Sequence, residues 1–155
     1  MTGRTIDRIA VGDRAEMTCT VTADLVSAFV TLSGDRNPIH RDAGFAATTT
    51  FGEPIAPGML SGALIAAVIG SELPGPGAIY LSQSLRFIRA VKLGDTLTAR
   101  VEVVEIMRER NRVRLRTECA NRAGEVVLVG EAWVMPPAAA LEETERATAL
   151  LARAA

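Results

Sequence analysis

A carboxylate, an amide and the only imidazole of the chain lie within six residues of one another, at Asp35, Asn37 and His40. An ordinary aspartate is ionised near neutral pH and an ordinary histidine is mostly neutral, so Asp35 and His40 could hold one water molecule and exchange protons with it. Pro38 lacks an N–H and favours an extended residue before it, which predicts a stiff, non-helical turn. Such a turn could aim both side chains at one point.

These residues also allow a purely structural interpretation. Asp35 and Asn37 could accept hydrogen bonds only from the backbone of their own turn, and His40 could cap the helical turn that follows. The short motif Gly-Asp-x-Asn-Pro by itself leaves both interpretations open.

The elements before and after the turn are expected to position it. An alternating pattern predicts a strand over residues 15–21, and apolar residues at helical spacing predict a helix over residues 22–33. Gly34 can adopt the left-handed conformation that ends a helix, so Asp35 is expected just past the helix end. Residues 41–57 are turn-rich and contain two prolines near their end, which predicts an ordered loop over the site.

Residues 58–72 are apolar nearly all round and contain many small residues, and residues 59–69 within them form the most apolar stretch of the chain. A helix that is apolar nearly all round is expected to be enclosed by the rest of the protein. The stretch is far shorter than the eighteen or more residues that cross a bilayer, so no membrane anchor is expected. Gly and Pro at positions 74–77 end the helix before a sheet begins.

Four strand-like runs follow, at residues 78–91, 96–107, 112–121 and 126–135. In the third run, charged residues alternate with apolar ones, which is typical of an antiparallel strand with one exposed face. The pattern therefore predicts the α+β class, with one central helix against a meander of long antiparallel strands.

Length and composition exclude several classes of protein. A chain of 155 residues is one ordinary domain, and 17 basic against 18 acidic residues give no nucleic-acid-binding stripe. Two cysteines a hundred residues apart argue against a zinc site, and no Gly-rich phosphate loop is present, so neither a metal nor a nucleotide cofactor is expected. The N-terminus lacks the apolar core of a secretory signal, which predicts a cytoplasmic protein.

The Ala-, Glu- and Leu-rich tail, residues 137–155, is predicted to be helical at least in part, and residues 1–136 to form the domain.

Several strings together resemble the MaoC-like enoyl-CoA hydratases, and in particular their single-domain, R-specific branch. The signature at residues 29–46 contains an aromatic residue, Leu-Ser-Gly-Asp-x-Asn-Pro-Ile-His and a later Ala. The resemblance continues through Phe-Ala-Ala-Thr-Thr at 45–49, Pro-Gly-Met-Leu at 57–60, Ile-Tyr-Leu-x-Gln-Ser-Leu-x-Phe at 79–87 and Gly-Asp at 94–95. It covers about residues 10–136.

The resemblance implies a hot-dog fold, a long antiparallel sheet wrapped round a central apolar helix. It also implies that Asp35 and His40 bind the catalytic water for reversible syn hydration of a trans-2-enoyl thioester, giving the R-3-hydroxyacyl product. Which of the two takes the first proton stays open. Asn37 is expected to support the pair, by orienting Asp35 or the water or by stabilising the turn.

Gly58 opens the buried helix, and its N–H at the positive end of the helix dipole is the expected donor to the developing oxyanion. Relatives often have His before this Gly-Met pair, whereas this chain has Pro57, which offers no donor. This difference leaves the N–H of Gly58 as the more exclusive donor. It is expected to affect the rate of the reaction and not the class of reaction.

The substrate is expected to be an acyl-CoA or an acyl thioester of acyl carrier protein. Arg86, Arg89 and Lys92 lie along or just past one strand and are candidates for contacts with coenzyme A phosphates, although each could equally be a solvated surface residue. A homodimer is predicted, because a sheet round one helix leaves an edge strand and apolar positions for a partner to cover. Such apolar positions include Leu97, Ala99 and Val101.

Two other functions compete with a hydratase. A hot-dog protein could bind acyl thioesters without turning them over, but an intact Asp35, His40 and Gly58 favours catalysis. A thioesterase would need an acidic residue aimed at the thioester carbon, and the central helix offers none before Glu72, at its far end. Ser61 and Ser84 have no base beside them in sequence, which disfavours a nucleophilic serine. The acyl chain length is not encoded in any of these residues.

Overall fold

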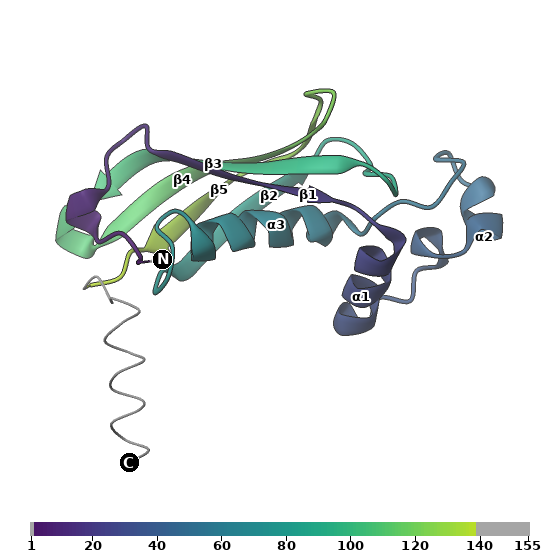
Figure 1. Ribbon diagram of the computed structural model, residues 1–155, viewed down its shortest axis with the longest axis horizontal. Helices are drawn as coiled ribbons and strands as arrows, with labels where there is room; N and C mark the ends of the chain where they lie inside the picture. Colours follow the sequence, from purple (N-terminus) through teal and green to yellow (C-terminus); the bar gives the residue numbers. More distant parts are fainter. Residues whose placement is uncertain (1, 139–155) are drawn as a thin grey trace, which may run out of the picture.

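The computed structural model of the protein describes residues 2–138 (Figure 1). A single antiparallel sheet has the strand order β1-β3-β4-β5-β2. Its strands are β1 (Arg14–Thr20), β2 (Ile79–Phe87), β3 (Thr96–Met107), β4 (Arg112–Asn121) and β5 (Val126–Met135). The helices are α1 (Ala23–Ser33), α2 (Ala43–Ala47) and α3 (Gly58–Ser71), with 3-10 turns η1 (Ile6–Arg8), η2 (Pro38–His40) and η3 (Arg108–Arg110). The architecture is the predicted α+β hot-dog fold. The predicted helical tail lies outside the described residues.

The helix α3 lies lengthwise along one face of the sheet, and α1 and α2 lie beyond its N-terminal end (Figure 1). The side of α3 that faces the sheet buries its large apolar residues, including Leu60, Ile65 and Ile69. The opposite side, with Met59 54% exposed, is not covered by any described part of the chain. The expectation that α3 is enclosed on all sides is therefore wrong for a single chain, because one sheet covers only one face of a helix.

The strands β3, β4 and β5 form the predicted meander, but β2 does not pair with β3. It runs instead along the far side of β5, while β1 covers the outer side of β3. The two edge strands are thus β1 and β2. The strand predicted at 78–91 is also shorter than expected, since it ends at Phe87.

The expected contact of Leu97, Ala99 and Val101 with a partner is wrong. These residues belong to β3, an inner strand, and their exposed fractions are 0%, 0% and 1%. Their side chains face the core that α3 covers. Alternation along the strand identified a buried face, but it could not show that the chain's own helix covers that face.

The helix α1, which precedes the site, begins and ends at the residues that the local sequence predicts. The side chain of Thr22 caps α1 by accepting a hydrogen bond from the N–H of Leu25 (3.1 Å). Gly34 ends the helix in the left-handed region, with φ 71° and ψ 14°. Two local expectations were wrong: residues 38–40 form a 3-10 turn, η2, and residues 41–57 contain the short helix α2, which the side chain of Asp42 caps at the N–H of Phe45.

Candidate active site

The turn between α1 and η2 is held by side-chain hydrogen bonds to its own backbone. Asp35 Oδ1 accepts from the N–H of Asn37 (2.9 Å), and Asn37 Oδ1 accepts from the N–H of Ile39 (3.2 Å). The structural interpretation of these two residues is therefore correct as far as it goes. The bond to Asn37 uses only one carboxylate oxygen, so Oδ2 of Asp35 is left for another partner.

That second oxygen lies beside the imidazole of His40. The distance from Asp35 Oδ2 to His40 Nε2 is 3.4 Å, and the His40 side chain is 9% exposed against 35% for Asp35. The structure thus brings together the two residues that the sequence singled out. The carboxylate is open to solvent on one side, while the ring is nearly buried.

The tautomer of His40 follows from its other nitrogen. Nδ1 lies 2.7 Å from the carbonyl oxygen of Ile55, and a carbonyl can only accept, so Nδ1 carries the hydrogen. In the neutral ring Nε2 then has a lone pair, and it faces a carboxylate that also only accepts. A water molecule that donates one hydrogen to each acceptor satisfies both.

Residues 55–58 connect this pair to the start of α3. The N–H of Ile55 donates to the carbonyl of Ile39 (3.3 Å), and the N–H of Ala56 donates to the carbonyl of Val91 (2.8 Å). Ile55 also forms an isolated antiparallel bridge with Lys92. Pro57 then precedes the first residue of α3, and no side chain caps this helix end. The N–H of Gly58 therefore remains available for a ligand within the described part of the chain.

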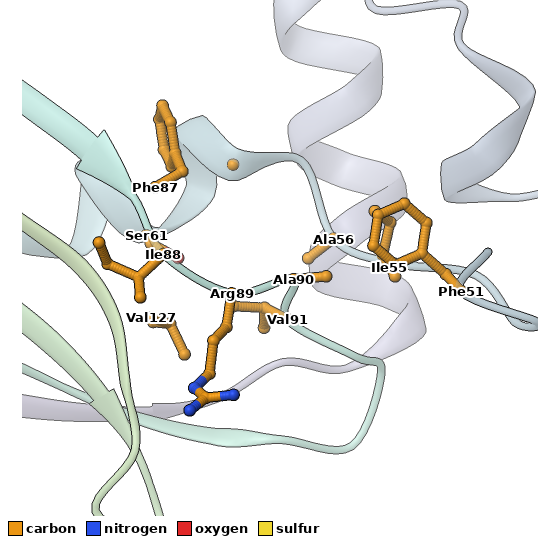
Figure 2. Close-up of a pocket in the computed structure, with 11 residues that line it drawn as sticks. Phe51, Ile55, Ala56, Ser61, Phe87, Ile88, Arg89, Ala90, Val91 and Val127 are labelled. Carbon is orange, nitrogen blue, oxygen red and sulfur yellow. The ribbon is translucent and has the colours of Figure 1, made fainter.

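A cavity of about 350 Å³ opens beside the N-terminus of α3 (Figure 2). Its wall is mostly apolar, with Phe51, Ile55 and Phe87 among its residues, and Gly58 and Ser61 line it from α3. The ring of Phe87 lies directly against Gly58, because a Cβ built on Gly58 would lie 3.0 Å from that ring. The lack of a side chain at Gly58 thus lets an aromatic wall approach the helix end.

His40 does not line this cavity. It lines a second hollow, of about 290 Å³, together with residues that include Arg41 and Leu93. Ile55 separates the two spaces, since its carbonyl bonds to His40 while the residue lines the first cavity. In a single chain the structure therefore connects the Asp35–His40 pair to Gly58 through residues 55–58 and does not place them on one cavity wall.

The three candidate phosphate contacts lie in different surroundings. Arg89 lines the first cavity, with its guanidinium 3.8 Å from Glu125. Lys92 forms an ion pair with Glu53, and this pairing raises the pKa of Lys92. Arg86 lines a hollow with Arg116 and Glu131, whereas its neighbours Leu85 and Phe87 approach α3. Arg86 thus lies on the face of the sheet that α3 does not cover.

Sequence reasoning missed one contributor to the site, Ile55, and assigned no role to another, Phe87, although Phe87 ends the string at 79–87 that resembles the family. Ile55 acts through its backbone carbonyl, and no side-chain pattern signals such a role. Phe87 is 51% exposed at the end of β2, and a large aromatic residue at a strand end after a polar stretch could have marked it.

Within residues 2–138, no three His, Cys, Asp or Glu side chains gather as a metal would require. Over the same residues, every helix is too short or too polar to cross a membrane.

The chain is similar to known proteins in both sequence and structure. An (R)-specific enoyl-CoA hydratase from Rhodospirillum rubrum is 47% identical over 84% of this chain and 90% of its own length. A 3-hydroxybutyryl-CoA dehydratase from Methylorubrum extorquens is 50% identical over 72% of this chain and 71% of its own. The unliganded R-hydratase PhaJ1 from Pseudomonas aeruginosa superposes with a TM-score of 0.86, at 50% identity over 90% of each chain.

The family model described as the MaoC like domain matches residues 9–123. This range includes the turn between α1 and η2, residues 55–58 and the whole of α3. With the geometry of the site and the identity to these relatives, this match shows that the chain belongs to the MaoC-like domain family.

Proposed function

We propose that the protein is an R-specific enoyl-CoA hydratase, which acts equally as a 3-hydroxyacyl-CoA dehydratase in the reverse direction. The observation that carries the proposal is the pair of acceptors, Asp35 Oδ2 and His40 Nε2, separated by 3.4 Å with the imidazole tautomer fixed by Ile55. Relatives that share the fold and up to half of the sequence are named for this chemistry.

In the proposed reaction, a water held by Asp35 and His40 attacks C3 of the enoyl thioester. The pair accepts a proton from the water, the C2–C3 π electrons move toward the carbonyl, and C2 then receives a proton from the same side. Water and proton thus add syn. The N–H of Gly58 donates to the oxygen that becomes negative, at the positive end of the α3 dipole. Asn37 supports the pair through its N–H bond to Asp35.

The substrate in this proposal is an acyl-CoA. Of the three candidate cations, Arg89 is the one favoured for a phosphate contact, because it lines the cavity that contains Gly58 and its distance of 3.8 Å to Glu125 leaves it only loosely paired.

We also propose a homodimer that forms through β2. This edge strand and the adjoining end of α3 expose a group of large apolar side chains, at Met59, Ile79, Tyr80, Leu81, Phe87 and Ile88. A second sheet that pairs with the open edge of β2 would cover them.

The proposal is tested by following the loss of enoyl absorbance with trans-2-enoyl-CoA substrates of increasing chain length. We expect turnover with at least one member of the series, an R-3-hydroxyacyl-CoA product and full activity after treatment with EDTA. An inactive folded protein that still binds acyl-CoA would favour the non-catalytic binding protein instead. Release of free coenzyme A would indicate a thioesterase.

A further inference from the structure

The first turn of α3 contains a nearly buried serine to which the proposed reaction assigns no role. Ser61 is 3% exposed, and it lines the same cavity as Gly58 (Figure 2). Among residues 2–138 its Oγ has no hydrogen-bond partner, whereas Thr31 in α1 bonds back to the carbonyl of Ser27. Since no buried side-chain oxygen or nitrogen of the described residues lacks a partner, the Oγ of Ser61 is the part of the residue that is open to the cavity, where a ligand could accept its hydrogen.

The position of Ser61 relative to Gly58 suits a shared ligand. Residues three apart in a helix lie on the same side, one turn from each other. Ser61 is also fixed from behind, because the thiol of Cys119 in β4 donates to its carbonyl oxygen at 3.5 Å. Burial, and to a smaller extent the charge of Glu118, raises the pKa of Cys119 to about 12, so the thiol keeps its hydrogen at neutral pH.

The N-terminus of α3 has no donor at its cap position. Pro57 has no N–H and no polar side chain, and α3 has no side-chain cap. Oxyanion sites commonly combine a backbone N–H with a second donor. Ser61 is the side-chain hydroxyl on the wall of this cavity.

We propose that Ser61 is a catalytic residue whose Oγ–H donates a second hydrogen bond, beside the Gly58 N–H, to the thioester carbonyl oxygen. This inference rests on the proposed hydratase function. Ser61 transfers no proton: the bond to C3 and the proton on C2 come from the water and the Asp35–His40 pair, and Ser61 stabilises the negative oxygen formed between these steps. A role as a nucleophile is not implied.

The test compares Ser61→Ala with the wild type and with Ser71→Ala, an exposed serine at the other end of the same helix. We expect Ser61→Ala to lose about 10- to 100-fold in kcat, near the lower end of the range for a lost oxyanion donor, while KM for the enoyl-CoA changes less than about threefold. Its thermal stability should stay close to that of the wild type, because the Oγ makes no hydrogen bond to the described residues that the variant would lose. Ser71→Ala should match the wild type.

A second measurement separates a direct contact from a structural role. The 3-oxoacyl thioester acetoacetyl-CoA forms an enolate that absorbs in the near ultraviolet, and a two-donor site should raise the enolate fraction of the bound compound. Ser61→Ala should lower that fraction at fixed pH. If Ser61→Ala does not fold, Ser61→Cys replaces it, because a thiol of similar size is a weak donor and should also lower kcat and the enolate fraction.

The outcomes distinguish this inference from the function on which it rests. A wild type that hydrates no enoyl-CoA would overturn the proposed function and the role of Ser61 with it. An active wild type whose Ser61 variants keep kcat within about twofold, well inside the loss expected for a missing donor, would overturn the role of Ser61 alone.

Discussion

At the scale of single residues, the site depends on two groups that both accept hydrogen bonds. With Nδ1 of His40 donating to Ile55, a neutral ring and an ionised Asp35 have no hydrogen between them at 3.4 Å. Their mutual contact therefore contributes little by itself. In the proposed reaction, a water molecule that donates to both completes the arrangement, and the same two groups remove its proton.

Asp35→Asn and His40→Gln test this unit. Asn replaces an acceptor oxygen with a donor, and Gln cannot exchange a proton at neutral pH, so each variant should lose roughly two to four orders of magnitude in kcat. The double variant should be little worse than the worse single one, because residues that act as a unit are not additive. Steady-state kinetics gives these values, and calorimetry should show nearly unchanged acyl-CoA affinity. Near-normal hydration by both folded single variants would contradict the proposed mechanism.

Gly58→Ala tests the contact between α3 and Phe87. The added methyl group would lie 3.0–3.4 Å from three atoms of the Phe87 ring, which is half-exposed and can move aside. The free energy of unfolding should change by less than about 1 kcal/mol, below the usual cost of overpacking a rigid core. The kcat should fall at least about tenfold, because the oxyanion position is crowded. Hydration assays and urea denaturation measure the two effects, and substantial restoration of kcat by Phe87→Leu in the same chain would confirm the contact.

At the scale of elements, the end of α1 determines where Asp35 begins. Gly34 is the residue in the left-handed region, and no atom lies within 4 Å of the Cβ that another residue would add there. The constraint is therefore on the backbone conformation and not on space.

Gly34→Ala should accordingly lower the free energy of unfolding by about 1 kcal/mol, the cost of the left-handed conformation for a residue with a Cβ. Gly34→Asn should lose less, because Asn tolerates this conformation better. Urea denaturation of the two variants measures the difference. Equal stability of Gly34→Ala and the wild type would mean that the helix end can rearrange.

Sequence patterns predicted those elements whose signals are local. The ends of α1 and α3 and the bounds of β3, β4 and β5 follow from caps, prolines and alternation. The pairing of β2 with β5, the burial of Leu97 beneath α3 and the bond from His40 to Ile55 depend on contacts between distant segments. The helix α2 was missed because it is one short turn among turn-forming residues, although Asp42 is an ordinary N-cap.

At the scale of the whole molecule, one side of the protein is unusually apolar. The β2 edge and the free side of α3 meet at residues such as Met59 and Phe87, which are 54% and 51% exposed. The same side contains the cavity with Gly58 and Ser61. A partner subunit placed there would both bury apolar surface and close the cavity.

Leu81→Lys tests the proposed dimer. Leu81 is 41% exposed in β2, and a charge on an edge strand opposes pairing with a second sheet. The variant should be monomeric at micromolar concentration in light scattering, where the wild type should be dimeric. Val11→Lys is the matched control, because Val11 is 63% exposed in a turn outside β2. A monomeric wild type would contradict the dimer.

The buried thiol of Cys119 makes stability dependent on pH in the alkaline range. Its pKa is raised by burial, and secondarily by Glu118, from 9.0 in an unfolded chain to about 12 in the folded protein. Above pH 9 the unfolded chain therefore releases a proton that the folded protein keeps, so the free energy of unfolding falls as pH rises, by up to about 1.4 kcal/mol per pH unit for one proton. Cys119→Ala should have a shallower slope between about pH 9 and 10, measured by urea denaturation under reducing conditions. If the variant and the wild type had the same slope, groups other than Cys119 would be the cause of the pH dependence.

Residues 55–58 limit where the length of this chain can change. The carbonyl of Ile55 orients His40, the N–H of Ala56 bonds to Val91, and Gly58 carries the N–H that is the proposed oxyanion donor. Four residues span at most about 14 Å, so this segment fixes the distance between the proposed water site at Asp35 and His40 and the proposed oxyanion site at Gly58. An insertion or deletion here would change that spacing, whereas length changes in the turn at residues 48–53 would leave it intact. Loop grafting that aims to alter substrate choice should therefore be confined to residues 48–53.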